Sequence, residues 1–363
     1  MIQQNSPILD EILSRTVQMN GSDLHLTAGL PPMVRVFGEL APMDMQKLAP
    51  QDIEDLILPI LEPHQREALD KALELDLSYS IPGLSRFRGN IMWQRGSLAV
   101  NFRVVAFSIP RMEDLGLPPA VKDLARLPRG LVLVTGPTGS GKSTTLASII
   151  DMINKERSLN IVTIENPIEF LHAHKKSIVK QREVGTDTHS FANALRHVLR
   201  HDPDVILVGE MRDLESISIA LTAAETGHLV FSTLHTQTAA LAVHRIVDVF
   251  PTGMRNQVSQ QLADSLQGII AQQLLPRTDD RGRVAAIELL LSTPAVRNLI
   301  REGKEHQLYT VMQTGRAMGM QTMDQSLADL CTAGIITRDM ALSRCVDQTE
   351  LERSLRKSNM FGA

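Results

Sequence analysis

The sequence predicts an α/β protein in which a small α+β domain precedes a larger domain built on a mainly parallel sheet. Three observations support this prediction. After residue 130, short apolar runs alternate with stretches of helical period, the pattern of parallel strands connected by helices. The first hundred residues instead carry several short strands in which apolar and polar residues alternate. Residues 131–145 read LVLVTGPTGSGKSTT, an apolar run followed by a glycine-rich turn, a lysine and hydroxyl residues.

Composition sets the outer limits. The chain has 363 residues, of which 43% are hydrophobic, so it is long enough for two domains and too apolar to be mainly disordered. With a net charge of −4 and 3% aromatic residues, it has no evident basic or stacking surface, and nucleic acid is not expected as a partner. Cys331 and Cys345 lack metal-type spacing and are expected to be free buried thiols in a reducing cytoplasm. Neither export nor direct membrane insertion is expected, because long apolar segments are missing.

Residues 1–107 are expected to form the α+β domain. Helical spacing predicts helices at residues 8–19 and 50–73, the second of them interrupted by prolines. Alternating patterns predict five strands, at residues 22–27, 33–37, 75–81, 85–93 and 98–105. Residues 108–119 contain three prolines and little periodicity, so they are predicted to be an interdomain linker.

Residues 120–290 are expected to form the parallel-sheet core. Its predicted strands are residues 131–135, 160–164, 205–209 and 229–233. Its predicted helices are residues 120–126, 142–155, 190–200 and 214–226. A ligand is expected at the carboxyl ends of these strands, as in other open α/β sheets. Residues 291–363 are expected to be a helical region with breaks near Gly303 and Gly334.

The glycine-rich turn has every fixed position of the phosphate-binding motif GxxxxGK[ST], between a predicted strand and a predicted helix. Its glycines allow successive N–H groups to turn inward and form an anion nest at the start of the helix. Lys142 is placed to reach the terminal phosphates of a nucleotide, and Ser143 to complete the ligand shell of Mg²⁺. The candidate nucleotide-binding residues are Gly136, Pro137, Thr138, Gly139, Ser140, Gly141, Lys142, Ser143 and Thr144, together with Glu165 and His228 outside the turn.

Carboxylates follow two of the predicted core strands. Glu165 and Glu169 come after residues 160–164, and Glu210 comes after the strand that begins at residue 205. A carboxylate at such a place can hold the Mg²⁺ shell or orient the attacking water, since phosphoryl transfer depends on positioning and charge. Glu210 is assigned to the metal, and Glu165 or Glu169 to the water. One of the three, most readily Glu165, could instead only cap a turn.

Histidines and arginines are further candidates. His235 follows the strand at residues 229–233 and could sense the terminal phosphate, while His228 comes one strand-length earlier. In the first domain, Arg88 and Arg103 belong to a set of arginines on or beside the strands. These arginines could form a solvated polar face, or a neighbouring subunit could offer one of them to the nucleotide. The residues alone leave both interpretations open.

Four segments in order resemble the Walker A, Asp, Walker B and His boxes of the secretion and pilus ATPases. They are GPTGSGKST at residues 136–144, TIENPIEF at 163–170, VILVGEMRD at 205–213 and GHLVFSTLHT at 227–236. Three further segments look like N- and C-terminal signatures of that family, namely GSDLHLT at 21–27, GLSRFRGN at 83–90 and AVRNLI at 295–300. The resemblance implies a PAS-like α+β N-terminal domain followed by a RecA-like P-loop NTPase core with a helical C-terminal region.

The resemblance also implies a function, an ATP-hydrolysing homohexameric motor that powers type IV pilus retraction and twitching motility. It makes Glu169 the catalytic glutamate, Glu210 the Walker B glutamate, and His228 and His235 the histidine-box residues. ATP and Mg²⁺ are the implied cofactors, with nucleotide bound between the domains. Among the N-terminal arginines, the two that match those completing the site in the family are Arg88 and Arg103.

The implied partners are an inner-membrane pilus platform protein and, as an option, a second retraction ATPase. The implied place is the cytoplasm, at the inner face of the cytoplasmic membrane. The AVRNLI segment is either a packing face or a surface needed for retraction rather than for ATP hydrolysis.

One residue departs from the family pattern, because Asn166 stands where the Asp box usually has an aspartate. Glu165 and Glu169 remain beside it, so hydrolysis is still expected. Two alternatives stay open, a non-hydrolysing accessory partner of another motor and a related ATPase of pilus assembly or secretion. Glu169 and Glu210 argue against the first, while AVRNLI and the absence of a cysteine-bearing zinc insert favour retraction over the second.

Overall fold

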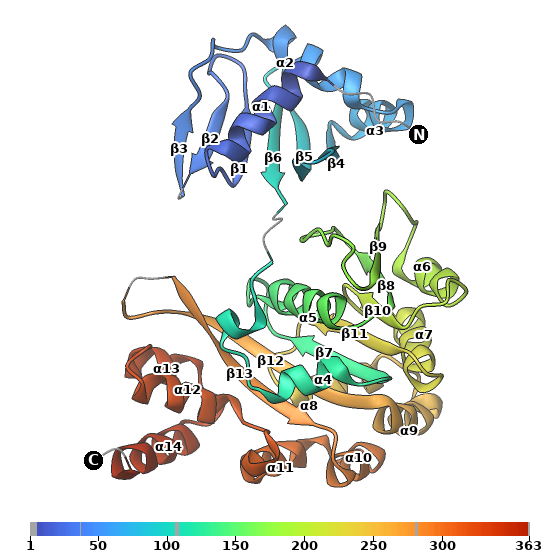
Figure 1. Ribbon diagram of the computed structural model, residues 1–363, viewed down its shortest axis with the longest axis vertical. Helices are drawn as coiled ribbons and strands as arrows, with labels where there is room; N and C mark the ends of the chain where they lie inside the picture. Colours follow the sequence, from blue (N-terminus) through green and yellow to red (C-terminus); the bar gives the residue numbers. More distant parts are fainter. Residues whose placement is uncertain (1–5, 37, 106–108, 280–281, 362–363) are drawn as a thin grey trace. The chain divides into compact units, whose positions relative to one another are not determined.

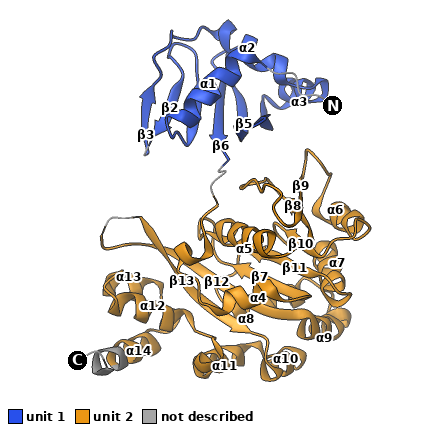
Figure 2. Cartoon of the chain, viewed as in Figure 1, with its two compact units in different colours: residues 1–107 blue, residues 108–363 orange. Residues whose placement is uncertain are grey.

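The computed structural model describes residues 6–36, 38–105, 109–279 and 282–361. The chain forms two compact units, Met1–Phe107 and Ser108–Ala363, which Figure 2 shows in different colours. The end of the predicted first domain and the start of the predicted linker fall on residues 106–108, outside the described residues.

In the described residues, the N-terminal unit is a six-stranded antiparallel sheet in the order β3-β2-β1-β6-β5-β4, accompanied by three α-helices and a short 3₁₀ helix at Leu58–Ile60. The strands are β1 Asp23–Leu26, β2 Met33–Val36, β3 Glu39–Pro42, β4 Glu74–Ile81, β5 Ser85–Gln94 and β6 Ser97–Val104. The helices are α1 Pro7–Gln18, α2 Pro50–Ile57 and α3 Pro63–Ala72. Apolar residues of the helices, such as Leu13 and Ile53, share one core with inward strand residues such as Phe102. The α+β architecture is confirmed, and β3 is an additional strand whose largely exposed residues give no alternating pattern.

The second unit is built on a seven-stranded sheet in the order β13-β12-β7-β11-β10-β8-β9. All neighbouring strands are parallel except the pair of β12 and β13. The strands are β7 Gly130–Thr135, β8 Asn160–Glu165, β9 Ile178–Glu183, β10 Val205–Val208, β11 Leu229–Leu234, β12 Leu266–Pro276 and β13 Arg283–Leu291. This sheet confirms the predicted RecA-like core. The hairpin of β12 and β13 and the edge strand β9 were not among the predicted strands.

Helices cover both faces of this sheet (Figure 1). The helices α4 Ala120–Arg126 and α5 Lys142–Glu156 share a core cluster with residues such as Val132 and Phe231. On the other face lie α6 Phe191–Val198, α7 Leu214–Glu225, α8 Ala239–Asp248 and α9 Arg255–Ser265. Their apolar residues pack against Leu133, Ile206 and Val230, which alternate along the strands with the residues that face α5. Both faces of the sheet are therefore buried, as its continuous apolar strands require.

The C-terminal part of the second unit is helical, as predicted. It contains α10 Pro294–Arg301, α11 Leu308–Thr314, α12 Met323–Thr332, α13 Arg338–Arg344 and α14 Gln348–Phe361. The AVRNLI segment lies in α10, where Val296 and Ile300 are buried and Arg297 is half-buried. Arg297 donates from Nε to the Ser292 hydroxyl at 3.0 Å. Part of this segment is thus a packing face.

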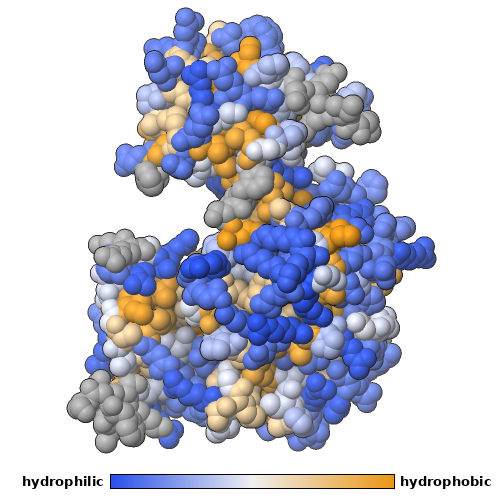
Figure 3. Space-filling view, viewed as in Figure 1, coloured by the Kyte–Doolittle hydropathy of each residue, from blue (hydrophilic) through white to orange (hydrophobic). Residues whose placement is uncertain are grey.

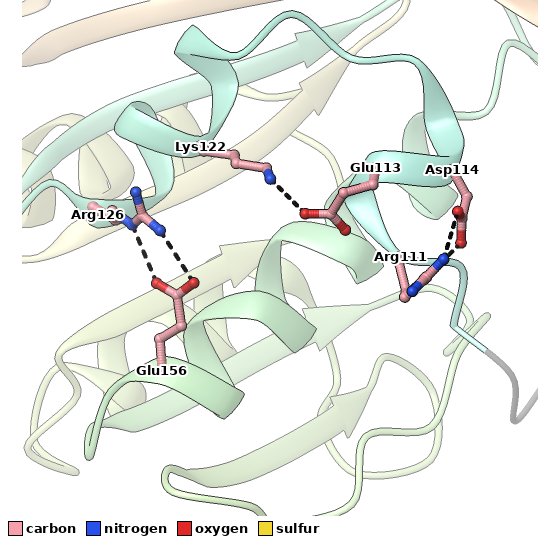
Figure 4. A network of polar contacts seen from close by, with 6 residues as sticks. All are labelled: Arg111, Glu113, Asp114, Lys122, Arg126 and Glu156. Atoms are coloured by element: carbon pink, nitrogen blue, oxygen red, sulfur yellow. Dashed lines mark hydrogen bonds and ion pairs between the residues drawn. The ribbon is translucent and has the colours of Figure 1, made fainter.

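Residues 109–119, predicted as linker, belong to the second unit. Met112 is buried in its core, and the Ser148 hydroxyl donates to the Pro110 carbonyl at 2.6 Å. Figure 4 shows ion pairs of this segment and of α4, the helix that follows it: Arg111 with Asp114, Glu113 with Lys122 of α4, and Arg126 of α4 with Glu156 of α5. The Ser148–Pro110 hydrogen bond attaches the segment to α5, the helix that the glycine-rich turn opens, and the Arg126–Glu156 pair attaches α4 to the same helix.

Hydrophilic residues cover much of the face that Figure 3 shows. Within the described ranges, every helix is too short or too polar to span a bilayer. Cys331 and Cys345 are free thiols that are half-buried rather than buried.

Candidate nucleotide site

The glycine-rich turn lies at the carboxyl end of β7, between that strand and α5. Gly136, Gly139 and Gly141 have φ of 144°, 79° and 89°, in the left-handed region that side chains with a Cβ avoid. A Cβ on Gly136 would also clash with the carbonyl oxygen of Gln272 in β12. Because α5 begins at Lys142, the turn delivers its backbone N–H groups to the N-terminus of a buried helix. The sequence of the turn and its geometry therefore agree on an anion site.

Lys142 is buried within this turn. Its Nζ donates to the carbonyls of Gly136 at 2.9 Å and Pro137 at 3.1 Å. Burial lowers the pKa of Lys142, while the charges of Glu169 and Glu210 act in the opposite direction. Both predicted carboxylates are therefore close enough to the phosphate-binding lysine to interact with it electrostatically.

Glu210 follows β10 and lies between the side chains of Arg212 and His235. Its Oε1 forms an ion pair with Arg212 Nε at 2.7 Å, and its Oε2 lies 3.3 Å from Nε2 of His235, the residue that follows β11. The Glu210 side chain is 16% exposed, whereas Arg212 and His235 are far more open to solvent. These residues and Arg245 of α8 line a cavity of about 480 Å³. Three functional groups thus meet where two neighbouring parallel strands end.

The Asp box forms the turn after β8. Glu165 is the last residue of the strand, and its Oε1 accepts from Thr163 Oγ1 at 2.6 Å and Gln181 Nε2 at 3.1 Å. Burial raises the pKa of Glu165, against these hydrogen bonds and one from the backbone N–H of Glu169. Glu169 itself is exposed. Glu165 is therefore engaged in holding its own turn, which leaves Glu169 as the free carboxylate of the pair.

His228 and His235 lie at opposite ends of β11. His228 precedes β11, where its carbonyl accepts from the Gly130 N–H at 3.0 Å and its Nδ1 is 3.0 Å from the Ala223 carbonyl. The six residues of β11 separate it from the carboxyl edge by about 20 Å at 3.3 Å per residue. His228 therefore lies apart from the phosphate-binding turn of its own chain, and its role in nucleotide binding stays a prediction. The two histidines are close in sequence, but a strand points them to opposite edges of the sheet.

Arg88 and Arg103 belong to the N-terminal unit, where they are direct partners on β5 and β6. Both are exposed, and Arg103 donates from Nε to Asp23 Oδ1 at 2.8 Å. Asp23 lies on β1 directly opposite Arg103 and is 8% exposed. Burial acts to raise the pKa of Asp23, but its hydrogen bonds from Arg103 and Ser22 outweigh this and keep the pKa below its usual value. Two like charges side by side on a sheet are unfavourable, and Asp23 compensates one of them.

Four polar residues at or near these groups were not singled out from the sequence. They are Asp23, Gln181, Arg212 and Gln272. Arg212 follows Glu210 by two residues in the Walker B segment, so the sequence motif could have indicated it as a site residue. Asp23 lies in the quoted GSDLHLT segment, but its contact is 80 residues away in sequence. Gln181 and Gln272 reach the site only through strand pairing.

A phosphate-binding turn between β7 and α5, with carboxylates at the ends of adjacent parallel strands, defines a P-loop ATPase with a RecA-like core. Residues 100–342 match the model of the type II/IV secretion system protein family, and the chain belongs to this family. The predicted family and the predicted class of enzyme are thereby confirmed.

Relatives cover the chain almost from end to end. It is 49% identical to the type IV pilus retraction ATPase PilT of Pseudomonas aeruginosa, over 92% of this chain and 96% of that one. It is 48% identical to a twitching motility protein of Neisseria gonorrhoeae, over 93% of this chain and 90% of that one. A crystal structure of the pilus retraction motor PilT with bound ADP matches with a TM-score of 0.87 and 51% identity, over 94% of this chain and 98% of that one.

Proposed function

We propose that this chain is an ATP-hydrolysing motor that powers the retraction of a type IV pilus. The observation that carries the proposal is a phosphate-binding turn after β7 with Glu169 and Glu210 following two other parallel strands of the same sheet, in a chain similar over nearly its whole length to a pilus retraction ATPase. A non-hydrolysing partner would need the turn and its lysine but not two carboxylates beside them.

The turn would hold the phosphates of ATP. Its glycines open the backbone N–H groups, and the Ser140 hydroxyl is buried without a hydrogen-bond partner, so polar groups remain for a ligand. Ser143, the second residue of α5, and the Glu210 carboxylate are the oxygen donors that suit Mg²⁺. When bound, Mg²⁺ neutralises charge on the phosphate oxygens.

Hydrolysis needs a group that orients water, and Glu169 is the carboxylate free to do so. Glu165 would fix the turn that carries it, through the hydrogen bond from the Glu169 backbone. His235 would respond to the terminal phosphate through its contact with Glu210. Asn166 is uncharged, and the roles assigned to Glu165 and Glu169 do not require a further charge in this turn.

Arg88 and Arg103 would complete the site from the N-terminal domain in a homohexameric ring. Support comes from their exposure and from the Asp23 carboxylate that fixes Arg103. A guanidinium brought in this way would couple hydrolysis to domain movement and hence to mechanical work. The partners would be a pilus platform protein of the inner membrane and, in some systems, a second retraction ATPase. The motor would then work at the cytoplasmic face of that membrane.

The proposed domain limits follow the same scheme, with an ATPase core at residues 120–290 and a C-terminal helical region at 291–363. The AVRNLI segment in α10 would serve retraction rather than hydrolysis.

The experiment that tests the function measures ATPase activity and particle size in one preparation of purified protein. We expect Mg²⁺-dependent turnover in the ring fraction, and restored twitching when the gene is expressed in a host that lacks its retraction ATPase. A ring with turnover that restores secretion or pilus assembly instead would identify the related ATPase. A ring without turnover would identify the accessory partner.

A further inference from the structure

Gln272 is a polar side chain inside the sheet of the second unit, and it contacts the phosphate-binding turn. It belongs to β12 and is 1% exposed. Its Oε1 accepts from the Thr145 hydroxyl of α5 at 3.0 Å, and its Nε2 donates to the Ser140 carbonyl at 2.6 Å. One side-chain amide therefore joins the turn, the helix that follows it and the neighbouring strand.

Strand pairing explains how Gln272 reaches the turn. β12 runs parallel to β7, and Ala271 lies beside Thr135, the last residue before the turn. Gln272 consequently comes next to Gly136, where any Cβ would clash with its carbonyl oxygen. A Cβ on Gly141 would lie 3.1 Å from its Nε2. Both the first and the last glycine of the turn thus pack directly against Gln272.

The hydrogen bond to the Ser140 carbonyl determines where the next N–H points. The Ser140–Gly141 peptide is trans, so its C=O and N–H groups point in opposite directions. With the carbonyl held toward Gln272, the Gly141 N–H is directed away from β12. Were the peptide to flip, a carbonyl oxygen would replace that donor and repel an anion. Gly141 has φ of 89° and no Cβ that would oppose such a flip. A hydrogen bond from outside the turn is therefore needed to keep the peptide in this orientation.

We propose that Gln272 is a positioning residue of the nucleotide site, which holds the Ser140–Gly141 peptide so that the Gly141 N–H faces the bound phosphates. The proposal rests on the proposed function, since it concerns the same nucleotide. The role needs a donor for the Ser140 carbonyl and an acceptor for the Thr145 hydroxyl, and a carboxamide supplies both. A carboxylate could not donate to the Ser140 carbonyl, and an aliphatic side chain could do neither.

The test measures the dissociation constant of ADP for purified protein variants, without hydrolysis, together with ATP turnover. Gln272→Leu keeps most of the side-chain volume and removes both hydrogen bonds of the amide. We expect this variant to bind ADP about tenfold or more weakly, because the Ser140 carbonyl loses the buried hydrogen bond that orients its peptide. Turnover at saturating ATP should fall less, because the residue would act on binding. Gln273→Leu is the matched control, since its amide contacts the Arg344 carbonyl rather than the turn.

A second pair of variants decides the matter if Gln272→Leu does not fold. Thr145→Val removes the hydroxyl that orients the Gln272 amide, and Thr145→Ser retains it. We expect weaker ADP binding for valine and near-normal binding for serine, with unchanged melting temperatures in the absence of nucleotide. In the double variant Gln272→Leu/Thr145→Val, the loss should not exceed that of Gln272→Leu alone.

Normal ADP affinity in Gln272→Leu and Thr145→Val, or a loss that only parallels a lower melting temperature, would overturn the inference and leave the proposed function intact. Wild-type protein that binds no nucleotide would overturn both. A protein that binds ADP but does not hydrolyse ATP would overturn only the proposed function, because the affinity comparison does not depend on turnover.

Discussion

The side chains of Glu210 and His235 meet 3.3 Å apart, between Oε2 of one and Nε2 of the other. β10 and β11 are paired in parallel, with Val208 beside Ser232, so the segments after both strands leave the sheet at one edge. The contact brings a predicted metal carboxylate and a predicted sensor histidine together. A change at Glu210 during turnover would therefore reach the segment that leads into α8.

Lys142→Ala should abolish ATP binding or turnover without unfolding the chain. In the structure the Lys142 ammonium donates hydrogen bonds to two carbonyls of its own turn, so its replacement would remove a group assigned to the phosphates and leave the apolar core intact. Turnover with Mg²⁺ and saturating ATP, and the melting temperature, are the measurements. Lys155→Ala is the control, because Lys155 lies in the same helix and pairs with Asp151 instead. Normal turnover in Lys142→Ala would falsify the site assignment.

Glu169→Gln and Glu210→Gln should each lower turnover by two or more orders of magnitude, the usual size of a positioning or acid–base defect. ATP binding should stay within about tenfold of wild type, because these carboxylates are assigned to water and metal rather than to the phosphates. Glu156→Gln, at the far end of α5, is the control. If affinity collapsed while turnover per bound ATP stayed normal, the two roles would be wrong.

The sequence was most informative where local pattern and motif coincide. The buried run of β7 and the fixed positions of the turn predict both a strand–turn–helix unit and its ligand class. β12 was harder to predict, because Gln272 and Gln273 interrupt its apolar pattern. The positions of His228 and His235 show a related limit, since a motif orders residues along the chain whereas a strand separates its two ends. Contacts such as that of Asp23 with Arg103 depend on the register in which two strands pair. The residues around either position do not indicate that register.

Glu288 should make stability depend on pH. It is fully buried on β13 and accepts from the Ala239 N–H at 2.6 Å. Burial raises its pKa from 4.5 to about 7, despite backbone hydrogen bonds from Ala239 and Met323. The folded chain thus keeps a proton that the unfolded chain releases above 4.5, so this stabilisation is complete at low pH and is lost as pH rises through 7. A pKa shift of this size corresponds to about 3 kcal/mol in the free energy of unfolding.

Glu288→Gln removes that titration, so the variant should gain stability relative to wild type between about pH 5 and about pH 8. Denaturant unfolding at several pH values measures the difference. Glu302→Gln is the control, because hydrogen bonds from Lys304 and Asn298 hold the pKa of that exposed carboxyl below its usual value, so its effect on stability should not change with pH over this range. A difference between Glu288→Gln and wild type that does not change with pH would show that Glu288 is ionised in the folded protein throughout this range.

The last prediction is that two subunits share each site. Arg103 is exposed and fixed by Asp23, in a unit of the chain that precedes the phosphate-binding turn, so a neighbouring protomer could supply it. An Arg103→Ala subunit and a Lys142→Ala subunit should each be inactive alone. A mixed ring contains interfaces where an intact Lys142 meets an intact Arg103, and these interfaces should recover part of the ATPase activity.

Two tags, one on each variant, show by co-purification whether mixed rings have formed. Mixed rings whose activity stays at the level of the separate variants would mean that Arg103 acts within its own chain or takes no part in hydrolysis.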